Sequence, residues 1–140
     1  MLNKNTKDFN IVHYIELLNK EQNFRNNNTS LYESDKVSYR ELLSYKIILE
    51  SQVRYNRQIE YISLIESYLN NEIQSFLLTI KLYEMEDENR LIQNNLEENI
   101  ELISNVSIDL KSSEFSILIE NIFSACKFLK SDLDSEKKWN

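Results

Sequence analysis

The chain has 140 residues and contains neither glycine nor proline. Two-residue hairpin turns between β-strands lean on glycine, because glycine adopts positive φ angles without a steric penalty. Helices need neither residue in their interiors, and serine, threonine, aspartate and asparagine can cap their ends. A chain without glycine also cannot form a glycine-rich phosphate-binding loop or a dinucleotide-binding fingerprint. The sequence therefore predicts an all-α protein.

The composition is typical of one globular domain. Hydrophobic residues make up 41% of the chain and aromatic residues 11%, which argues against disorder. Glycine, proline and alanine have GC-rich codons, and alanine occurs once, at Ala125, so an AT-rich genome is indicated. The sequence has no apolar run of about 18 residues and no signal peptide. We therefore expect no membrane insertion, and a cytoplasmic protein or, if plastid-encoded, a stromal one.

Apolar residues at helical spacing predict a single-domain bundle of five or six helices. The stretches with this spacing are residues 6–24, 34–69, 73–83, 92–110 and 112–130. Thr6 and Ser34 are candidate N-caps. Residues 25–35 are expected to form a flexible linker, and residues 131–140 a polar tail.

Two of these helices have a predicted core face. The face of the long second stretch is Leu42, Tyr45, Leu49, Gln52, Tyr55 and Ile59. The face of the last helix is Phe115, Leu118, Ile122, Cys126 and Leu129.

Two consecutive asparagines, Asn70 and Asn71, interrupt the helical pattern. Asparagine tolerates the left-handed backbone conformation better than any residue except glycine. We therefore predict a helix end at this point, followed by a new helix. The alternative is one continuous helix, because each asparagine costs only about 0.7 kcal/mol relative to alanine.

The stretch YISLIESYLNNEIQSF at residues 61–76, with LIENIFSACKFLKSDLD at residues 118–134, resembles the colicin D-type immunity proteins. The matching positions are Tyr61, Leu64, Ile65, Tyr68, Leu69, Asn70, Glu72, Ile73, Leu118, Ile122, Phe123 and Phe128. The corner at Asn70 and Asn71 lacks the glycine of the family. The resemblance covers about half of the chain. It implies a small helical protein that blocks a tRNA-cutting toxin through an acidic face.

Charge is unevenly distributed along the chain. Residues 84–120 hold ten acidic and two basic side chains, whereas residues 36–57 hold five basic and two acidic ones. An acidic face attracts basic partners and speeds association. The residues predicted to bind the partner are Glu84, Glu86, Asp87, Glu88, Glu97, Glu98 and Glu101. The alternative is a solvated face that serves solubility alone.

The basic stretch at residues 36–57 suggests two alternatives. Its tyrosines, Tyr39, Tyr45 and Tyr55, alternate with cations as in a surface that stacks on bases and contacts phosphates. A net charge of −7 opposes direct binding of nucleic acid, so we expect none. The simpler alternative is that this helix packs beside the acidic ones.

Catalytic and metal sites are hard to assemble from this sequence. His13 is the single histidine and Cys126 the single cysteine, so a Cys/His zinc site is excluded. The Glu-x-x-His motif of di-metal bundles is absent. A phosphate-accepting role for His13 remains an alternative, as does a structural one. We predict no enzyme, no cofactor and no metal.

These observations lead to two hypotheses. The first is an immunity-type inhibitor, an acidic helical protein that binds the basic surface of a nuclease toxin. The second is a small structural or accessory subunit of a larger complex.

Overall fold

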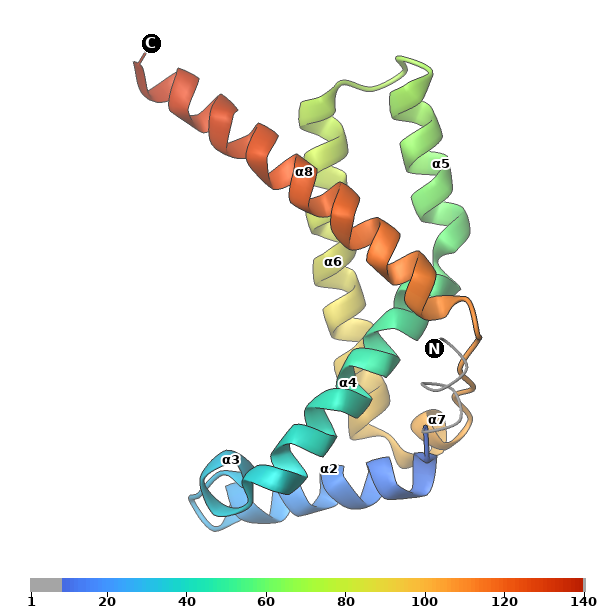
Figure 1. The fold of residues 1–140 in the computed structure, drawn as a ribbon, viewed down its shortest axis with the longest axis vertical. Coiled ribbons are helices and arrows are strands. Elements are labelled where there is room, and N and C mark those ends of the chain that lie inside the picture. Colours follow the sequence, from blue (N-terminus) through green and yellow to red (C-terminus); the bar gives the residue numbers. More distant parts are fainter. Residues whose placement is uncertain (1–8, 140) are drawn as a thin grey trace.

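The computed structural model describes the backbone of residues 9–139 and the side chains of residues 9–127. All regular structure in this range is helical, which confirms the predicted all-α bundle (Figure 1). The described helices number seven rather than five or six, because two of them are about one turn long. They are α2 (Ile11–Asn26), α3 (Leu31–Ser34), α4 (Lys36–Asn56), α5 (Gln58–Leu69), α6 (Ser75–Glu98), α7 (Ile100–Ser104) and α8 (Ser112–Trp139).

The ends of the helices differ from several predicted ones. Thr6 lies outside the described residues, and α2 instead takes Asn10 as its N-cap. The N-cap of α4 is Asp35 rather than Ser34. Residues 25–35, predicted to be a linker, include α3, whose Leu31 is buried in the core. The backbone of α8 remains helical to Trp139, through most of the predicted polar tail.

Asparagine takes the place of glycine at two helix ends. Asn28 and Asn71 have φ angles of 59° and 60°, in the left-handed region. The amide after each asparagine donates a hydrogen bond to the carbonyl five residues earlier, at 3.0 Å after Asn28 and 2.8 Å after Asn71. The amide of each asparagine itself donates to the carbonyl three residues earlier. These are the two hydrogen bonds of a Schellman cap, so the predicted break at residues 70–71 is confirmed.

Two interior predictions were wrong, and one helix boundary was not located from the sequence. The pattern at residues 34–69 is broken at Arg57, which separates α4 from α5. The acidic run at residues 84–89 lies within the continuous helix α6 and does not end it. The helix predicted at residues 92–110 is divided between the end of α6, the short α7 and a non-helical loop at residues 105–111.

The apolar core consists of two clusters. The first cluster joins α2, α3, α4 and α7, and its buried members are Tyr14, Leu17, Leu31, Leu42, Tyr45, Leu49, Val53 and Ile103. The second joins α5, α6 and α8, and its buried members are Tyr61, Leu78, Leu82, Met85, Ile119 and Cys126. Helix α8 crosses α4 and α6, and its carboxyl end projects away from the other helices (Figure 1).

The predicted core faces were partly wrong. On α4, Leu42, Tyr45, Leu49 and Gln52 are buried as predicted, but Ile59, beyond the break at Arg57, is 80% exposed. On α8, Cys126 is buried as predicted, whereas Leu118 is exposed and its neighbour Ile119 is buried. The side chain of Leu129, also predicted for this face, lies outside the described residues. Ser112 and Ser116 are also buried on α8. These small residues face α4 where the two helices cross, and the apolar pattern alone did not indicate them.

Candidate protein-binding surfaces

The seven carboxylates of the predicted acidic face do not form one surface. Five of them are exposed: Glu84, Asp87, Glu88, Glu98 and Glu101. Glu84, Asp87 and Glu88 share one side of α6, because residues three and four apart are neighbours on a helix. Glu98 lies ten residues beyond Glu88, which corresponds to about 15 Å along the helix axis. The exposed carboxylates therefore form two groups, one in the middle of α6 and one at the α6–α7 junction.

The carboxylate of Glu86 binds side chains inside the protein, so Glu86 does not belong to the exposed groups. Its carboxylate accepts hydrogen bonds from the Arg54 guanidinium at 2.9 and 3.2 Å and from the Tyr61 hydroxyl at 3.2 Å. Its side chain is 16% exposed. Asn89 in turn donates to the Tyr61 hydroxyl at 2.6 Å. Burial and the nearby carboxylate of Glu86 raise the pKa of Tyr61 to about 12.

Glu97 is also held by a cation of α4. Its carboxylate lies 2.7 Å from the ammonium of Lys46, and its side chain is 9% exposed. Burial, together with the carboxylate of Glu97, raises the pKa of the Tyr14 hydroxyl well above its ordinary value. Glu97 therefore helps to join α6 to α4 and is poorly placed to meet a partner.

Arg54 is the centre of a polar cluster that joins α4, α6 and α8. We define the arginine cluster as Arg54, Glu50, Glu86, Ser116 and Glu120. The Arg54 side chain is 6% exposed and lies 3.0 Å from Glu50 and 2.9 Å from Glu120. It also donates to the Ser116 hydroxyl at 2.8 Å. Burial opposes the charged form of Arg54, but its hydrogen bonds to Glu86 and Glu120 outweigh this and raise its pKa.

The basic stretch of α4 is largely neutralised by α6. Lys46 pairs with Glu97 and Arg54 with Glu86, while Arg57 lies 3.5 Å from Glu88. This is the packing of basic against acidic helices that the sequence suggested as the simpler alternative. The tyrosines do not form a stacking surface, because Tyr45 is buried and Tyr55 packs edge-on against Phe115.

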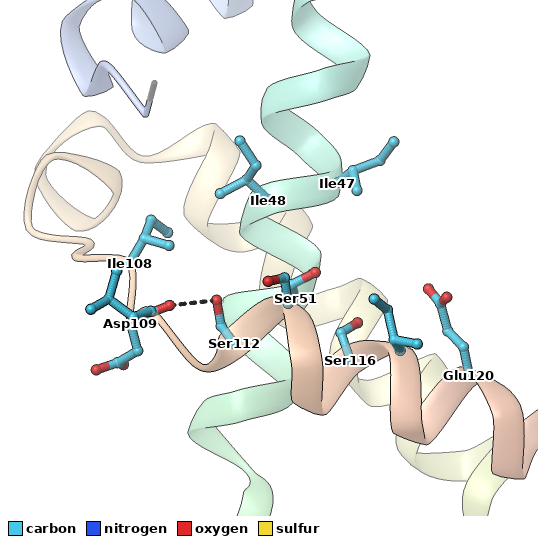
Figure 2. Close-up of a pocket in the computed structure, with 11 residues that line it drawn as sticks. Ile47, Ile48, Ser51, Ile108, Asp109, Ser112, Ser116 and Glu120 are labelled. Carbon is cyan, nitrogen blue, oxygen red and sulfur yellow. Dashed lines mark hydrogen bonds between the residues drawn. The ribbon is translucent and has the colours of Figure 1, made fainter. Parts of the chain in front are cut away.

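A second surface is an apolar groove between α4, the 105–111 loop and the start of α8 (Figure 2). Its volume is about 200 Å³. Its apolar walls are Ile47, Ile48, Ile108, Leu110 and Ile117. Ser51, Ser112, Ser113 and Ser116 also line it, as do the carboxylates Asp109 and Glu120. The apolar pattern of the sequence does not indicate this groove, because the groove depends on how α4, α8 and the 105–111 loop are placed in space.

The loop on one side of the groove is held by Gln52. The Gln52 side chain donates to the Asp109 carboxylate at 2.8 Å and accepts from the Asp109 amide at 2.7 Å. Gln52 is 2% exposed. A buried side chain on α4 therefore fixes the loop at Asp109, and with it one wall of the groove.

His13 and Cys126, the residues considered for catalysis or metal binding, both interact with other side chains of the fold. His13 interacts with Glu16 on its own helix and with Glu41 on α4. The hydrogen bond to Glu41 is the main reason that the pKa of His13 is raised above its ordinary value. Cys126 is buried in the second cluster. In the described part of the chain no group of His, Cys, Asp and Glu side chains is arranged to hold a metal ion.

A search of residues 9–139 for a membrane-spanning segment found no helix that is both long and apolar enough. Comparisons of the chain with protein-family models, with curated proteins and with solved structures found no significant match.

Proposed function

We propose that this chain is a non-catalytic binding protein of the immunity type, which inhibits a nuclease toxin by covering its basic surface. The observation that carries this proposal is the set of exposed carboxylates on α6 and α7. Two residues of the predicted acidic face, Glu86 and Glu97, form ion pairs within the fold instead. Partner contact is therefore assigned to Glu84, Asp87, Glu88, Glu98 and Glu101.

The placement of the resembling stretches supports the same proposal. Tyr61 from the first stretch and Ile122 and Phe123 from the second all belong to the second core cluster. The two stretches therefore pack together, as the parts of one inhibitor domain would. Leu69 and Leu118, which also match, are exposed and do not take part in this packing.

The experiment is a charge reversal in the middle of α6. A nuclease encoded beside this gene would serve as the partner, and association is followed by stopped flow at several salt concentrations. Replacing Glu84, Asp87 and Glu88 by lysine is expected to slow association by about tenfold or more, because steering by charge changes on-rates by 10–10³. The same triple variant is expected to lose the ability to rescue cells from the toxin.

A matched control changes the same amount of charge elsewhere. Glu33, Glu66 and Glu114 are exposed carboxylates outside α6 and α7. Replacing these three by lysine changes the net charge by the same amount as the α6 reversal. If only the net charge mattered, both triple variants would slow association to the same extent. Equal slowing would exclude a specific role for α6. Circular dichroism of both variants checks that the helices remain.

The second candidate, an accessory subunit, is favoured by a different observation. Several large aliphatic side chains are exposed, including Ile59 at 80%, Leu69 at 71% and Leu91 at 69%. A permanent interface buries side chains of this kind. One result would favour the accessory subunit. Association with the partner would depend neither on salt nor on the α6 charge reversal, but would be lost in the variants Ile59→Lys and Leu69→Lys.

A further inference from the structure

We propose that the groove between α4 and α8 is a docking site for a basic amphipathic helix of another protein. The helix inserts apolar side chains between Ile47 and Ile117 and places lysine or arginine beside Asp109 and Glu120. This assigns a second surface to the chain, separate from the exposed carboxylates of α6 and α7, and does not depend on the immunity hypothesis.

The apolar walls of the groove favour contact with apolar side chains of a partner. Ile47, Leu110 and Ile117 are 62%, 54% and 56% exposed, although they line a concave surface. Ligand pockets for small molecules have volumes of roughly 300–1,000 Å³. The groove holds about 200 Å³, which suits one or two side chains of a protein partner better than a cofactor. Anchors of this kind dominate the affinity of protein interfaces.

Two serines on the floor of the groove, Ser112 and Ser116, already have hydrogen-bond partners. The Ser112 hydroxyl donates to the carbonyl of Asp109 at 2.8 Å, which is the hydrogen bond drawn in Figure 2. The Ser116 hydroxyl accepts a hydrogen bond from Arg54 at 2.8 Å. An apolar side chain above these serines therefore leaves neither hydroxyl without a partner, and no polar group of the occupant is needed there.

The charges of the groove specify a basic occupant. Its two ionisable lining residues, Asp109 and Glu120, are both acidic, and Figure 2 shows them on opposite sides of the serine floor. One oxygen of Glu120 accepts from Arg54 and one oxygen of Asp109 accepts from Gln52. A carboxylate offers about four acceptor positions, so both can accept further hydrogen bonds from a lysine or arginine.

The shape of the groove favours a helix as the occupant. Two crossing helices bound it, and an amphipathic helix fits such a site with apolar residues spaced by three and four positions. On a helix of this spacing the cations lie on the flanks of the apolar stripe. Flanking cations reach Asp109 on one side and Glu120 on the other while the apolar stripe covers the serines.

The test uses a designed peptide and the whole chain. The probe is a Leu/Lys amphipathic helix of about five turns, or roughly 18 residues. Binding is followed by NMR of isotope-labelled isoleucine methyl groups. Saturable shifts are expected at Ile47, Ile108 and Ile117. A Leu/Glu peptide with the same leucine spacing is expected to cause no such shifts.

Two variants locate the binding. Ile117→Ser is expected to weaken binding of the Leu/Lys peptide about tenfold or more, as for the loss of an interface anchor. Ile59→Ser, which changes an even more exposed isoleucine on α5, is expected to leave binding unchanged. Both side chains are exposed, so both variants are expected to fold, and circular dichroism checks this.

Other outcomes would overturn the proposal. Shifts confined to methyl groups outside the groove would mean that the peptide binds the α6 carboxylates. Equal binding of the Leu/Glu peptide would remove the role of Asp109 and Glu120. Shifts of the groove methyl groups when the chain alone is concentrated would assign the groove to a second copy of this chain. The absence of any saturable shift would also refute the docking site.

Discussion

Replacing Arg54 by methionine tests whether the arginine cluster holds α4, α6 and α8 together. The guanidinium forms two hydrogen bonds with Glu86 and one each with Ser116 and Glu120. Methionine preserves much of the apolar length of arginine but none of its donors. The variant therefore removes the cation and leaves the buried carboxylate of Glu86 without a partner charge.

The expected magnitude follows from the exposure of each partner. Glu120 and Glu50 have side chains that are 58% and 42% exposed, so water replaces Arg54 there and each pair contributes at most about 1 kcal/mol. Glu86 is 16% exposed and cannot be rehydrated in the same way. Breaking a buried ion pair from one side costs about 3–5 kcal/mol. We expect Arg54→Met to lower the free energy of unfolding by about 3–4 kcal/mol, mainly through Glu86.

Urea unfolding followed by circular dichroism measures this change. With a denaturant slope of about 2 kcal/mol per M, the midpoint is expected to fall by about 1.5–2 M. The double variant Arg54→Met with Glu86→Leu is expected to recover much of the loss, because an apolar pair needs no compensating charge. Arg90→Met is the control, since Arg90 pairs only with exposed Asp87 among the ion pairs described, and about 0.5 kcal/mol or less is expected.

Two results would refute the reasoning. A loss below about 1 kcal/mol for Arg54→Met would mean that Glu86 is solvated or protonated in the folded protein. A double variant no more stable than Arg54→Met would mean that the loss comes from packing rather than from the unpaired carboxylate.

Two further predictions concern single side chains. Asn71→Gly is expected to be neutral or slightly stabilising in thermal unfolding, whereas Asn71→Ala is expected to cost about 1 kcal/mol, because alanine lacks the tolerance of asparagine for positive φ; equal melting temperatures would contradict this. The NMR titration of His13 is expected to give a pKa above 6.5, and Glu41→Gln should lower it. A raised pKa stabilises the folded chain below pH 6.5, and this contribution is lost as the pH rises through the folded-state value.

The predictions that succeeded were those that depend on local chemistry. A chain without glycine and proline favours helices throughout, and the structure is helical. Without glycine, asparagine is the residue best suited to a left-handed corner, which is why the helix end at Asn71 could be located from the sequence. Asn28 meets the same requirement at the end of α2, within a run of three asparagines that the sequence analysis assigned to a linker.

The acidic face was only partly predictable, because the number of charges in a stretch does not say which way they point. The missing signal was the order of opposite charges on two helices. Lys46 meets Glu97, whereas Arg54, further along α4, meets Glu86, earlier on α6. Oppositely ordered cations and carboxylates are the pattern of two antiparallel helices. Comparing α4 with α6 in this way would have marked Glu86 and Glu97 as internal partners.

The groove was beyond the reach of sequence periodicity for a different reason. Leu110 follows Val106 and Ile103 at helical spacing, yet the backbone at residues 105–111 is not helical. Its conformation depends on hydrogen bonds between Asp109 and Gln52, which is 57 residues away in the chain. Local propensity cannot register such a contact. The groove exists because a buried side chain of α4 holds Asp109 in a loop. Weakening that contact, for example by Gln52→Leu, would therefore be expected to disturb the groove before it disturbs the helices.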